Sequence, residues 1–178
     1  MKLFKVDKNL MQTKLILVNE QDQIVGEAEK FEVHKNGLLH RAFSIVIFNS
    51  KKEMLLQKRA PQKYHSGGLW TNACCSHPRI NENLETAIHK RLYEEMGFDC
   101  PLDKKSEFIY KVWIDKQQFF EYEYDHIFVG KYDGEIKPNQ EEVCEFKWVD
   151  MQKLKADVQK HPYEYTYWFR EIIEKFGW

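Results

Sequence analysis

The chain has 178 residues, of which 43% are hydrophobic and 15% aromatic. This composition allows a substantial core and excludes a disordered chain or a coiled coil, so we expect one globular domain over residues 1–178. The 27 Lys and Arg residues nearly balance the 28 Asp and Glu residues, giving a net charge of −1 that argues against broad nucleic-acid binding.

The sequence lacks the patterns typical of export or membrane insertion. Residues 1–8 are charged and have no apolar stretch of the signal-peptide kind, and the longest apolar run, 42–48, is far too short to cross a bilayer. We therefore expect a cytoplasmic monomer or weak homodimer with no nucleic-acid or membrane partner. In that compartment the four cysteines are expected to be thiols. They are Cys74, Cys75, Cys100 and Cys144.

The first part of the chain predicts two β-hairpins. Residues 14–18 and 24–26 enclose a polar turn, and residues 42–48 and 54–57 enclose a second one. A long loop through the pair Gly67-Gly68 then leads into a segment with two adjacent cysteines. No internal repeat or linker interrupts this order.

The segment 83–96 predicts the clearest helix, and Gly97 follows it where helices commonly end. Its apolar stripe at helical spacing consists of Leu84, Ile88 and Leu92. Arg91 and Glu95 project within or beside this stripe. A charged side chain there is costly unless it is paired, binds a metal or lines a site. We therefore favour a functional role for both.

The rest of the chain predicts three strands, at 108–114, 119–129 and 144–149, and an aromatic-rich terminal helix at 163–176. Strands come first, followed by a central helix, more strands and a final helix. This order indicates an α+β fold or an α/β/α sandwich with a mixed β-sheet.

The segment 72–78, Asn-Ala-Cys-Cys-Ser-His-Pro, places a thiol two residues before a histidine. Cys75 in this position can serve as an acid, a nucleophile or a metal ligand, and His77 can bind a metal. The alternative is a buried structural cysteine, which is the role we expect for Cys74.

Three imidazoles and two carboxylates form a candidate metal set. His34 and His40 flank a predicted turn, while Glu121 and Glu123 share one face of a predicted strand. Two carboxylates on one face repel each other unless a cation lies between them. Together with His77 they suit a divalent transition metal, or magnesium less well. For any single histidine a surface position is the better interpretation; the whole pattern favours a metal site.

Seven segments, taken in order, carry a resemblance to a known family. They are Glu29-Lys30 with His34, then 39–44, 57–60, 69–72, 75–78, 91–97 and 121–123. From about Leu15 to the terminal helix, the chain resembles type 1 isopentenyl-diphosphate isomerases, a branch of the Nudix-like fold. The resemblance implies a Nudix-like α/β/α sandwich with a mixed sheet. It also implies metal-dependent isomerisation of isopentenyl diphosphate to dimethylallyl diphosphate, by protonation and deprotonation, in isoprenoid biosynthesis.

The resemblance also implies roles for individual residues. Cys75 matches the catalytic thiol and Glu123 the catalytic carboxylate, with Tyr110 assisting Glu123 and Trp168 beside the substrate's hydrocarbon. The ligands implied for a Mn²⁺, Zn²⁺ or Mg²⁺ ion are His34, His40, His77, Glu121 and Glu123. The basic residues implied around the diphosphate are Lys30, Arg59, Lys63 and Arg91. Glu95 matches a ligand of a second ion, Mg²⁺, that bridges to the diphosphate; no flavin or nucleotide cofactor is implied.

One alternative is a Nudix pyrophosphohydrolase that cleaves a nucleoside-diphosphate derivative. It would use Glu94 and Glu95 with magnesium and would not need Cys75. The hydrolase pattern, however, has a glutamate at the position of Arg91, as well as an arginine at Lys90 and a glycine at Ser76. A cation in place of that carboxylate favours holding a diphosphate over multi-magnesium hydrolysis.

A second alternative is a non-enzymatic module stabilised by zinc at Cys74, Cys75, His77 and more distant histidines. Structural zinc sites usually have paired Cys-x-x-Cys spacing, which adjacent cysteines lack. This makes the binding module the least favoured of the three functions.

Overall fold

The computed structural model describes residues 13–63, 65–115 and 118–177. Its strands are β1 (Lys14–Val18), β2 (Ile24–Glu29), β3 (His40–Phe48), β4 (Met54–Arg59), β5 (Trp70–Thr71), β6 (Cys74–Ser76), β7 (Leu102–Ile114), β8 (Phe119–Lys131) and β9 (Val143–Val149). Its helices are α1 (Lys30–Asn36), α2 (Leu84–Met96), α3 (Met151–Lys160) and α4 (Tyr167–Lys175), with a 3₁₀ turn at Pro162–Glu164. None of the helices in the described residues is both long enough and apolar enough to span a bilayer.

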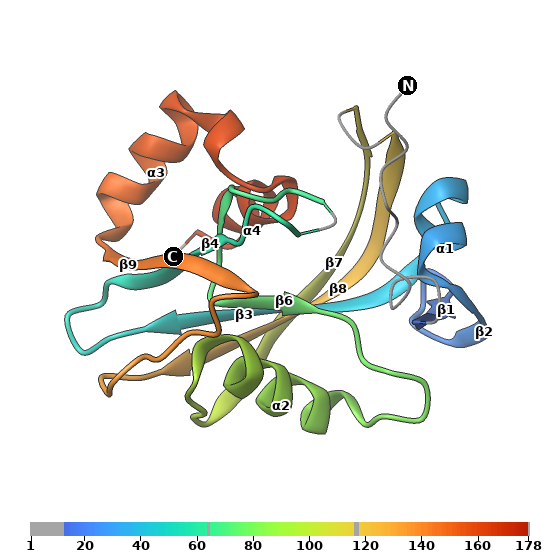
Figure 1. The fold of residues 1–178 in the computed structure, drawn as a ribbon, viewed down its shortest axis with the longest axis horizontal. Helices are drawn as coiled ribbons and strands as arrows, with labels where there is room; N and C mark the ends of the chain where they lie inside the picture. Colours follow the sequence, from blue (N-terminus) through green and yellow to red (C-terminus); the bar gives the residue numbers. More distant parts are fainter. Residues whose placement is uncertain (1–12, 64, 116–117, 178) are drawn as a thin grey trace.

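Strand β3 organises the sheet. It pairs in parallel with β8 along its whole length, from His40 opposite Glu123 to Phe48 opposite Lys131. The other edge of β3 pairs in succession with β1, β6 and β4, all antiparallel. The sheet is therefore mixed, as expected, with β3 at its centre (Figure 1).

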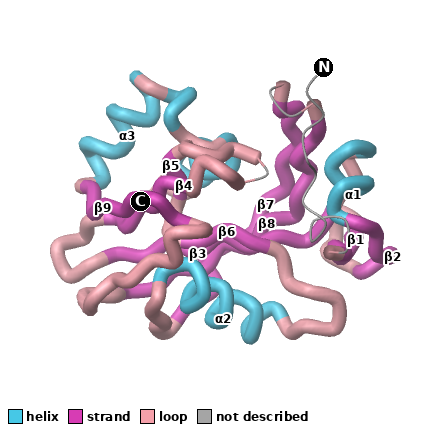
Figure 2. The backbone as a smooth tube through the Cα atoms, viewed as in Figure 1, coloured by secondary structure: helices cyan, strands magenta, loops and turns pink. Residues whose placement is uncertain are grey.

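Helices cover both faces of the sheet, which confirms the expected α/β/α sandwich (Figure 2). Because successive side chains of a strand point to opposite faces, β3 contributes to two separate cores. The core on the α2 side includes Phe43, Ile45, Ile47, Cys74, Ile88, Leu92 and Met96. The core on the α3 and α4 side includes Val46, Ile127, Leu154, Trp168, Phe169 and Ile172.

Several sequence expectations are confirmed within these bounds. Segment 83–96 forms α2, whose N-cap Asn83 accepts a hydrogen bond from the backbone N–H of Glu85, and Gly97 ends it in the left-handed region at φ 75°. Strands β1 and β2 form the first hairpin. All four cysteines are free, as expected of thiols, and Cys74 is fully buried in the α2 core.

Other expectations are wrong. The second hairpin hardly exists, because β3 and β4 pair only at Phe48 and Met54 and then diverge towards other partners. The terminal helix begins at Tyr167, not at 163, because the 3₁₀ turn precedes it. Strand β7 begins six residues before 108, at Leu102. Helices α1 and α3 and strands β5 and β6 were not predicted.

Gly97 is expected to be essential for stability. A Cβ at this residue would require an unfavourable positive φ and would overlap the carbonyl oxygen of Lys137. That carbonyl belongs to a loop fixed to the end of α2, where Lys137 N–H donates to Met96 O at 3.2 Å. We expect Gly97→Ala to lower the free energy of unfolding by about 2–5 kcal/mol, from backbone strain plus overpacking.

The matched control is Gly68→Ala. Gly68 also has a positive φ, 80°, but an added Cβ there would meet nothing within 4 Å. Gly68→Ala should lower the free energy of unfolding only by the backbone strain, about 1–2 kcal/mol. Urea denaturation of both variants measures the difference; equal losses would show that the contact with Lys137 relaxes at no cost.

Candidate active site

One face of the sheet carries a row of polar residues placed by the β3–β8 register. Glu121 and Glu123 alternate on β8, and Glu123 lies opposite both His40 of β3 and Tyr110 of β7. Cys75 of β6 lies opposite Ser44, which is four residues after His40 on β3. Cross-strand neighbours share a face, so these side chains all emerge on the α4 side of the sheet.

The imidazoles of His34 and His40 are oriented by backbone carbonyls. His34 lies on α1, fully buried, with Nδ1 2.6 Å from the carbonyl oxygen of Lys30, and His40 Nδ1 is 3.0 Å from that of Leu38. The expected turn at residues 36–37 is in fact the end of α1, where Gly37 is left-handed at φ 60°. With Nδ1 held by a carbonyl, each ring presents to the interior its Nε2, the nitrogen that could hold a metal ion.

The five residues expected to bind a metal lie together. His34 Nε2 is 3.4 Å from Glu121 Oε1, and Glu123 Oε1 is 2.9 Å from His77 Nε2 and 3.6 Å from His40 Nε2. These residues belong to overlapping groups whose ligand atoms lie within 4.8 Å of one another. The sequence pattern therefore converges on one place.

The chemistry of this set fits a divalent metal. Both carboxylate oxygens of Glu121 are buried and accept no hydrogen bond from the described residues. Burial lowers the pKa of His77 to about 3 despite its bond to Glu123, so its imidazole is neutral. Burial opposes the charge on Glu123, but hydrogen bonds from His40 and His77 outweigh it and hold the pKa of Glu123 well below its usual range. A neutral imidazole at His77 and an ionised carboxylate at Glu123 are the ligand forms that a transition metal requires. At His34, burial lowers the pKa but the neighbouring Glu121 more than offsets it, so the pKa is raised.

Sequence reasoning missed His65. It lies in the β4–β5 loop with 7% of its surface exposed, and its Nε2 is 3.4 Å from Glu121 Oε1. Burial, together with the charge of Arg59, lowers the pKa of its ring well below the usual value. A single histidine just before the Gly67-Gly68 pair belongs to no helical or strand pattern in the sequence. Only the folded loop therefore reveals its position.

Cys75 lies in a pocket of hydrogen-bonding groups. Its Sγ donates to Asn72 Oδ1 at 2.9 Å and accepts from Trp168 Nε1 at 2.9 Å. Asn72 is itself fixed by donating to two backbone carbonyls. Burial, together with the charge of Asp125, raises the pKa of the Cys75 thiol to about 12. Of the three roles open to Cys75, this protonated thiol suits a proton-transfer group better than a thiolate nucleophile or metal ligand.

Tyr110 and Trp168 each contact one of these reacting groups. The Tyr110 hydroxyl donates to Glu123 Oε2 at 2.5 Å, so Glu123 is held by the phenol on one oxygen and by His77 on the other. Trp168, from α4, is 3% exposed and donates from Nε1 to Thr71 Oγ1 at 2.9 Å as well as to Cys75. The first turn of α4 thus forms one wall beside the thiol.

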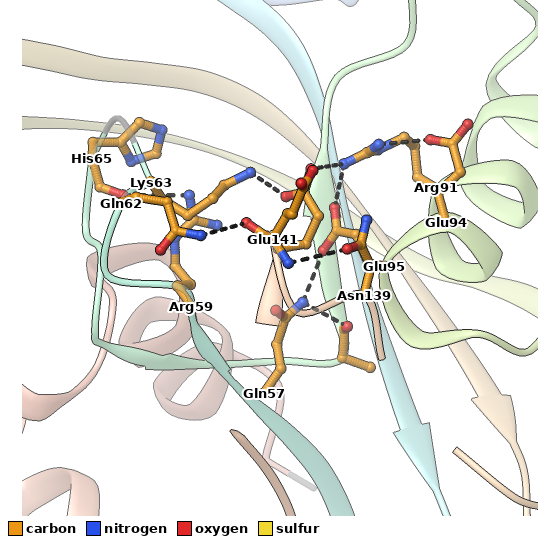
Figure 3. Close-up of polar contacts among 12 residues, drawn as sticks. Gln57, Arg59, Gln62, Lys63, His65, Arg91, Glu94, Glu95, Asn139 and Glu141 are labelled. Atoms are coloured by element: carbon orange, nitrogen blue, oxygen red, sulfur yellow. Dashed lines mark hydrogen bonds and ion pairs between the residues drawn. The ribbon is translucent and has the colours of Figure 1, made fainter. Parts of the chain in front are cut away.

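The charged residues of α2 form a second polar cluster (Figure 3). Arg91 donates from Nη2 to Glu95 Oε1 at 2.7 Å and from Nη1 to Glu94 Oε2 at 2.6 Å. Gln57 Nε2 donates to Glu95 Oε2 at 2.9 Å. Glu95 is thus paired at both oxygens, and it belongs to none of the metal-binding groups found among the described residues. The cost of burying these charges is offset by this pairing.

The basic residues converge on an adjoining region. Glu142 forms ion pairs with Lys63 and, at 3.7 Å, with Arg91. Burial, together with the charges of Lys63 and Arg59, lowers the pKa of Lys30 to about 8. A pocket of about 210 Å³ beside His77 is lined by Lys30 and Arg91, among others. Mutually repelling cations beside a pocket favour the binding of a multiply charged anion.

Comparisons with known proteins identify the family. The NUDIX domain family model matches residues 38–169. Isopentenyl-diphosphate Delta-isomerase 2 of Photorhabdus laumondii subsp. laumondii is 54% identical over 159 residues, which is 89% of each chain. Isopentenyl-diphosphate Delta-isomerase 1 of Aromatoleum aromaticum is 46% identical and 93% of each chain is covered.

Solved structures show the fold. The crystal structure of DR0079 from Deinococcus radiodurans has a TM-score of 0.75 at 16% identity, covering 91% of this chain and 98% of that one. The MutT protein from Methanosarcina mazei has a TM-score of 0.64 at 19% identity, covering 78% and 93%. With the matches over most of its length, the chain belongs to the NUDIX domain family and, within it, to the isopentenyl-diphosphate Delta-isomerases.

Proposed function

We propose that the protein isomerises isopentenyl diphosphate to dimethylallyl diphosphate, using Cys75 and Glu123 as its two proton-transfer groups. The observation that supports this most directly is the pair itself. A half-buried protonated thiol and a buried ionised carboxylate emerge on the same face of one sheet. The relatives named isopentenyl-diphosphate Delta-isomerase support the substrate.

The reaction needs one proton added and another removed. A proton is added at the terminal alkene carbon, a tertiary carbocation forms at C3, and a proton is lost from C2, so that the double bond moves by one carbon. One of Cys75 and Glu123 gives a proton and the other accepts one. An alkene is a very weak base, so the acid must be well placed, and the burial of Glu123, Tyr110 and Trp168 limits the access of water to the cation.

The neighbours of the pair have supporting roles. Tyr110 holds and polarises Glu123 through its 2.5 Å hydrogen bond. The ring of Trp168 lies beside the thiol and stabilises the carbocation by roughly 1–2 kcal/mol. We assign the diphosphate to Lys30, Arg59, Lys63 and Arg91. Holding the diphosphate matters because it becomes a potential leaving group once cationic charge develops nearby.

The metal would be held by His34, His40, His77, Glu121 and Glu123. Mn²⁺, Zn²⁺ or Mg²⁺ there would supply positive charge that fixes the orientation of Glu123 and tunes its acidity. We assign Mg²⁺ beside the diphosphate to Glu95. No flavin or nucleotide is needed for the transfer of protons. The free thiols of all four cysteines agree with a cytoplasmic location.

The hydrolase alternative is disfavoured at Arg91. The hydrolase pattern has a glutamate at this position, and here a guanidinium occupies it and bonds to Glu94 and Glu95. The carboxylate set for several magnesium ions is therefore incomplete, whereas the isomerase needs one Mg²⁺ beside the diphosphate. Phosphate release from nucleoside-diphosphate derivatives that survives Cys75→Ala would instead support the hydrolase. The isomerase requires the thiol, so the same variant separates the two functions.

Removal of either reacting group should abolish isomerisation. We expect Cys75→Ala and Glu123→Gln each to lower kcat by at least about 10²–10⁴-fold, the range for a positioned acid or base. Turnover is measured as dimethylallyl diphosphate formed with added Mg²⁺, and deuterium uptake from D₂O follows the proton step. The control is Cys144→Ala, which removes an exposed cysteine and should leave turnover unchanged. Activity of Cys75→Ala within tenfold of the wild type would refute the role of the thiol.

Tyr110→Phe tests the support of Glu123. A hydrogen bond to a charged group contributes about 1.5–3 kcal/mol, so its loss should lower kcat by about 10–100-fold. KM should stay nearly constant because the phenol contacts the carboxylate and not the basic region. Tyr163→Phe, at a tyrosine with 89% of its surface exposed, is the control. An effect confined to KM would contradict this assignment.

Metal removal separates the enzyme from a zinc-stabilised module. We expect a chelator to abolish turnover and lower the melting temperature, because Glu121 and the imidazoles lose their shared ion, while the far-ultraviolet circular dichroism stays native. The sheet and its two cores do not depend on the ion. Restoring activity with Mn²⁺, Zn²⁺ and Mg²⁺ in turn identifies the effective metal. Complete unfolding in chelator would favour the binding module.

A further inference from the structure

We propose that His65 is a sixth ligand side chain of the metal site, so that the site offers four imidazoles and two carboxylates. This rests on the metal site of the proposed function and adds a residue from a separate loop. His65 comes from the β4–β5 loop, whereas the other ligands come from α1, β3, β8 and the segment after β6.

The position of His65 mirrors that of His34. Its Nε2 is 3.4 Å from Glu121 Oε1, the same oxygen that His34 Nε2 approaches at 3.4 Å. The ligand atoms of all three residues lie within 4.8 Å of one another. Two imidazoles thus approach one carboxylate oxygen at equal distance from different elements.

These distances are longer than usual direct hydrogen bonds and are compatible with ligands around one ion. Bonds from N–H to oxygen are usually 2.7–3.2 Å long. In an octahedron, ligand atoms about 2.0–2.2 Å from a shared ion lie about 3.0 Å apart when adjacent and about 4.2 Å apart when opposite. The separations of Glu121 Oε1 from the two imidazoles lie between these two values.

Glu121 gives independent support for a cation at this point. It is completely buried, and neither carboxylate oxygen accepts a hydrogen bond from the described residues. An ionised carboxylate in that state is costly unless a cation compensates it. His65 and His34 approach this carboxylate from two different elements, so an ion beside Glu121 would meet both.

The loop is built to hold His65 in place. Backbone bonds close it at both ends, from Arg59 N–H to Leu69 O at 3.0 Å and from Gly68 N–H to Arg59 O at 2.9 Å. Arg59 Nη2 also donates to the carbonyl oxygen of His65 at 3.3 Å. Figure 3 shows His65 near Lys63, on the loop that follows Arg59. Metal binding at His65 would therefore fix the loop that carries Lys63 and begins directly after Arg59, two of the proposed diphosphate-binding residues.

The test measures metal binding and not turnover. Co²⁺ is titrated into the apoprotein in competition with a chelator, and its visible d–d absorption is recorded. We expect His65→Gln to weaken Co²⁺ binding about 10–100-fold and to change the band positions and intensities. His77→Gln is the positive control. His89→Gln is the matched negative control, because His89 lies on α2 and pairs with Asp99.

The outcomes separate the two levels of the hypothesis. If His77→Gln loses Co²⁺ and its spectrum while His65→Gln keeps both, the role of His65 is refuted and the five-residue site stands. If the wild type binds no Co²⁺, the metal site of the proposed function fails together with His65. Loss of turnover in His65→Gln with an unchanged Co²⁺ spectrum also refutes the proposal, because it would indicate a substrate contact.

A measurement on the wild type decides the matter if the variant does not fold. Protein labelled with ¹⁵N-histidine is titrated with Zn²⁺, and the ring nitrogen signals are followed by NMR. Four imidazoles with coordination-shifted nitrogens are expected. Coordination shifts at only three imidazoles would overturn the proposal.

Discussion

The parallel pairing of β3 with β8 is the interaction on which the rest of the structure depends. Nine consecutive residue pairs, from His40–Glu123 to Phe48–Lys131, fix which side chains share a face. A slip of one residue on β8 would turn Glu121 and Glu123 into the apolar core beneath α2 and bring Phe128 to the polar face. Burial of the apolar residues on the α2 side therefore enforces the register, and the register assembles the polar face. The same logic separates the adjacent cysteines, since Cys74 joins the α2 core while Cys75 faces the site.

Burying this polar face is energetically unfavourable, and its three carboxyl groups differ in the partners that stabilise them. Asp125 accepts a hydrogen bond from Ser44 at 2.8 Å, while burial and the charge of Glu123 raise its pKa well above the usual range. Glu123 has Tyr110 and His77 as partners, whereas the oxygens of Glu121 accept no hydrogen bond from the described residues. Three carboxyl groups alternating on one strand thus differ in their surroundings: Asp125 has a raised pKa, Glu123 has two hydrogen-bond donors, and Glu121 lies beside the imidazoles of His34 and His65. A polar row of this kind departs from the rules for a stable core, as functional sites commonly do.

The sequence predicted a structural element correctly where the local residue pattern was strong. Helix α2 has a cap, a stripe and a terminal glycine, so its bounds followed from the sequence. The two-residue spacing of Glu121 and Glu123 likewise placed both on one face. Helix α1 has only seven residues, too few to show a periodic pattern, and depends on tertiary packing. Helix α3 was missed although its sequence has an N-cap, Asp150, and apolar residues at helical spacing, Leu154 and Val158. The second hairpin failed because β3 and β4 find better partners far away in the sequence. The position of His65 in the site could not be predicted for the same reason, since the residues that surround it are distant in the sequence.

The β4–β5 loop joins the two ends of the site. Arg59 at the end of β4 and Lys63 in the loop lie on the basic side, and His65 approaches Glu121. Thr71 of β5, at the far end, accepts the Trp168 N–H beside the thiol. The loop closes tightly only because Gly67 lacks a side chain: a Cβ there would overlap the carbonyl oxygen of Pro61. The backbone bonds that close the loop and the close approach at Gly67 restrict its conformations, so ordering it around an anion would cost little conformational entropy. Under the proposed function, a diphosphate held by Arg59 and Lys63 would lie at one end of this segment, with His65 and Thr71 further along it. This arrangement fits a reaction in which a reactive carbocation must form only after the diphosphate is held.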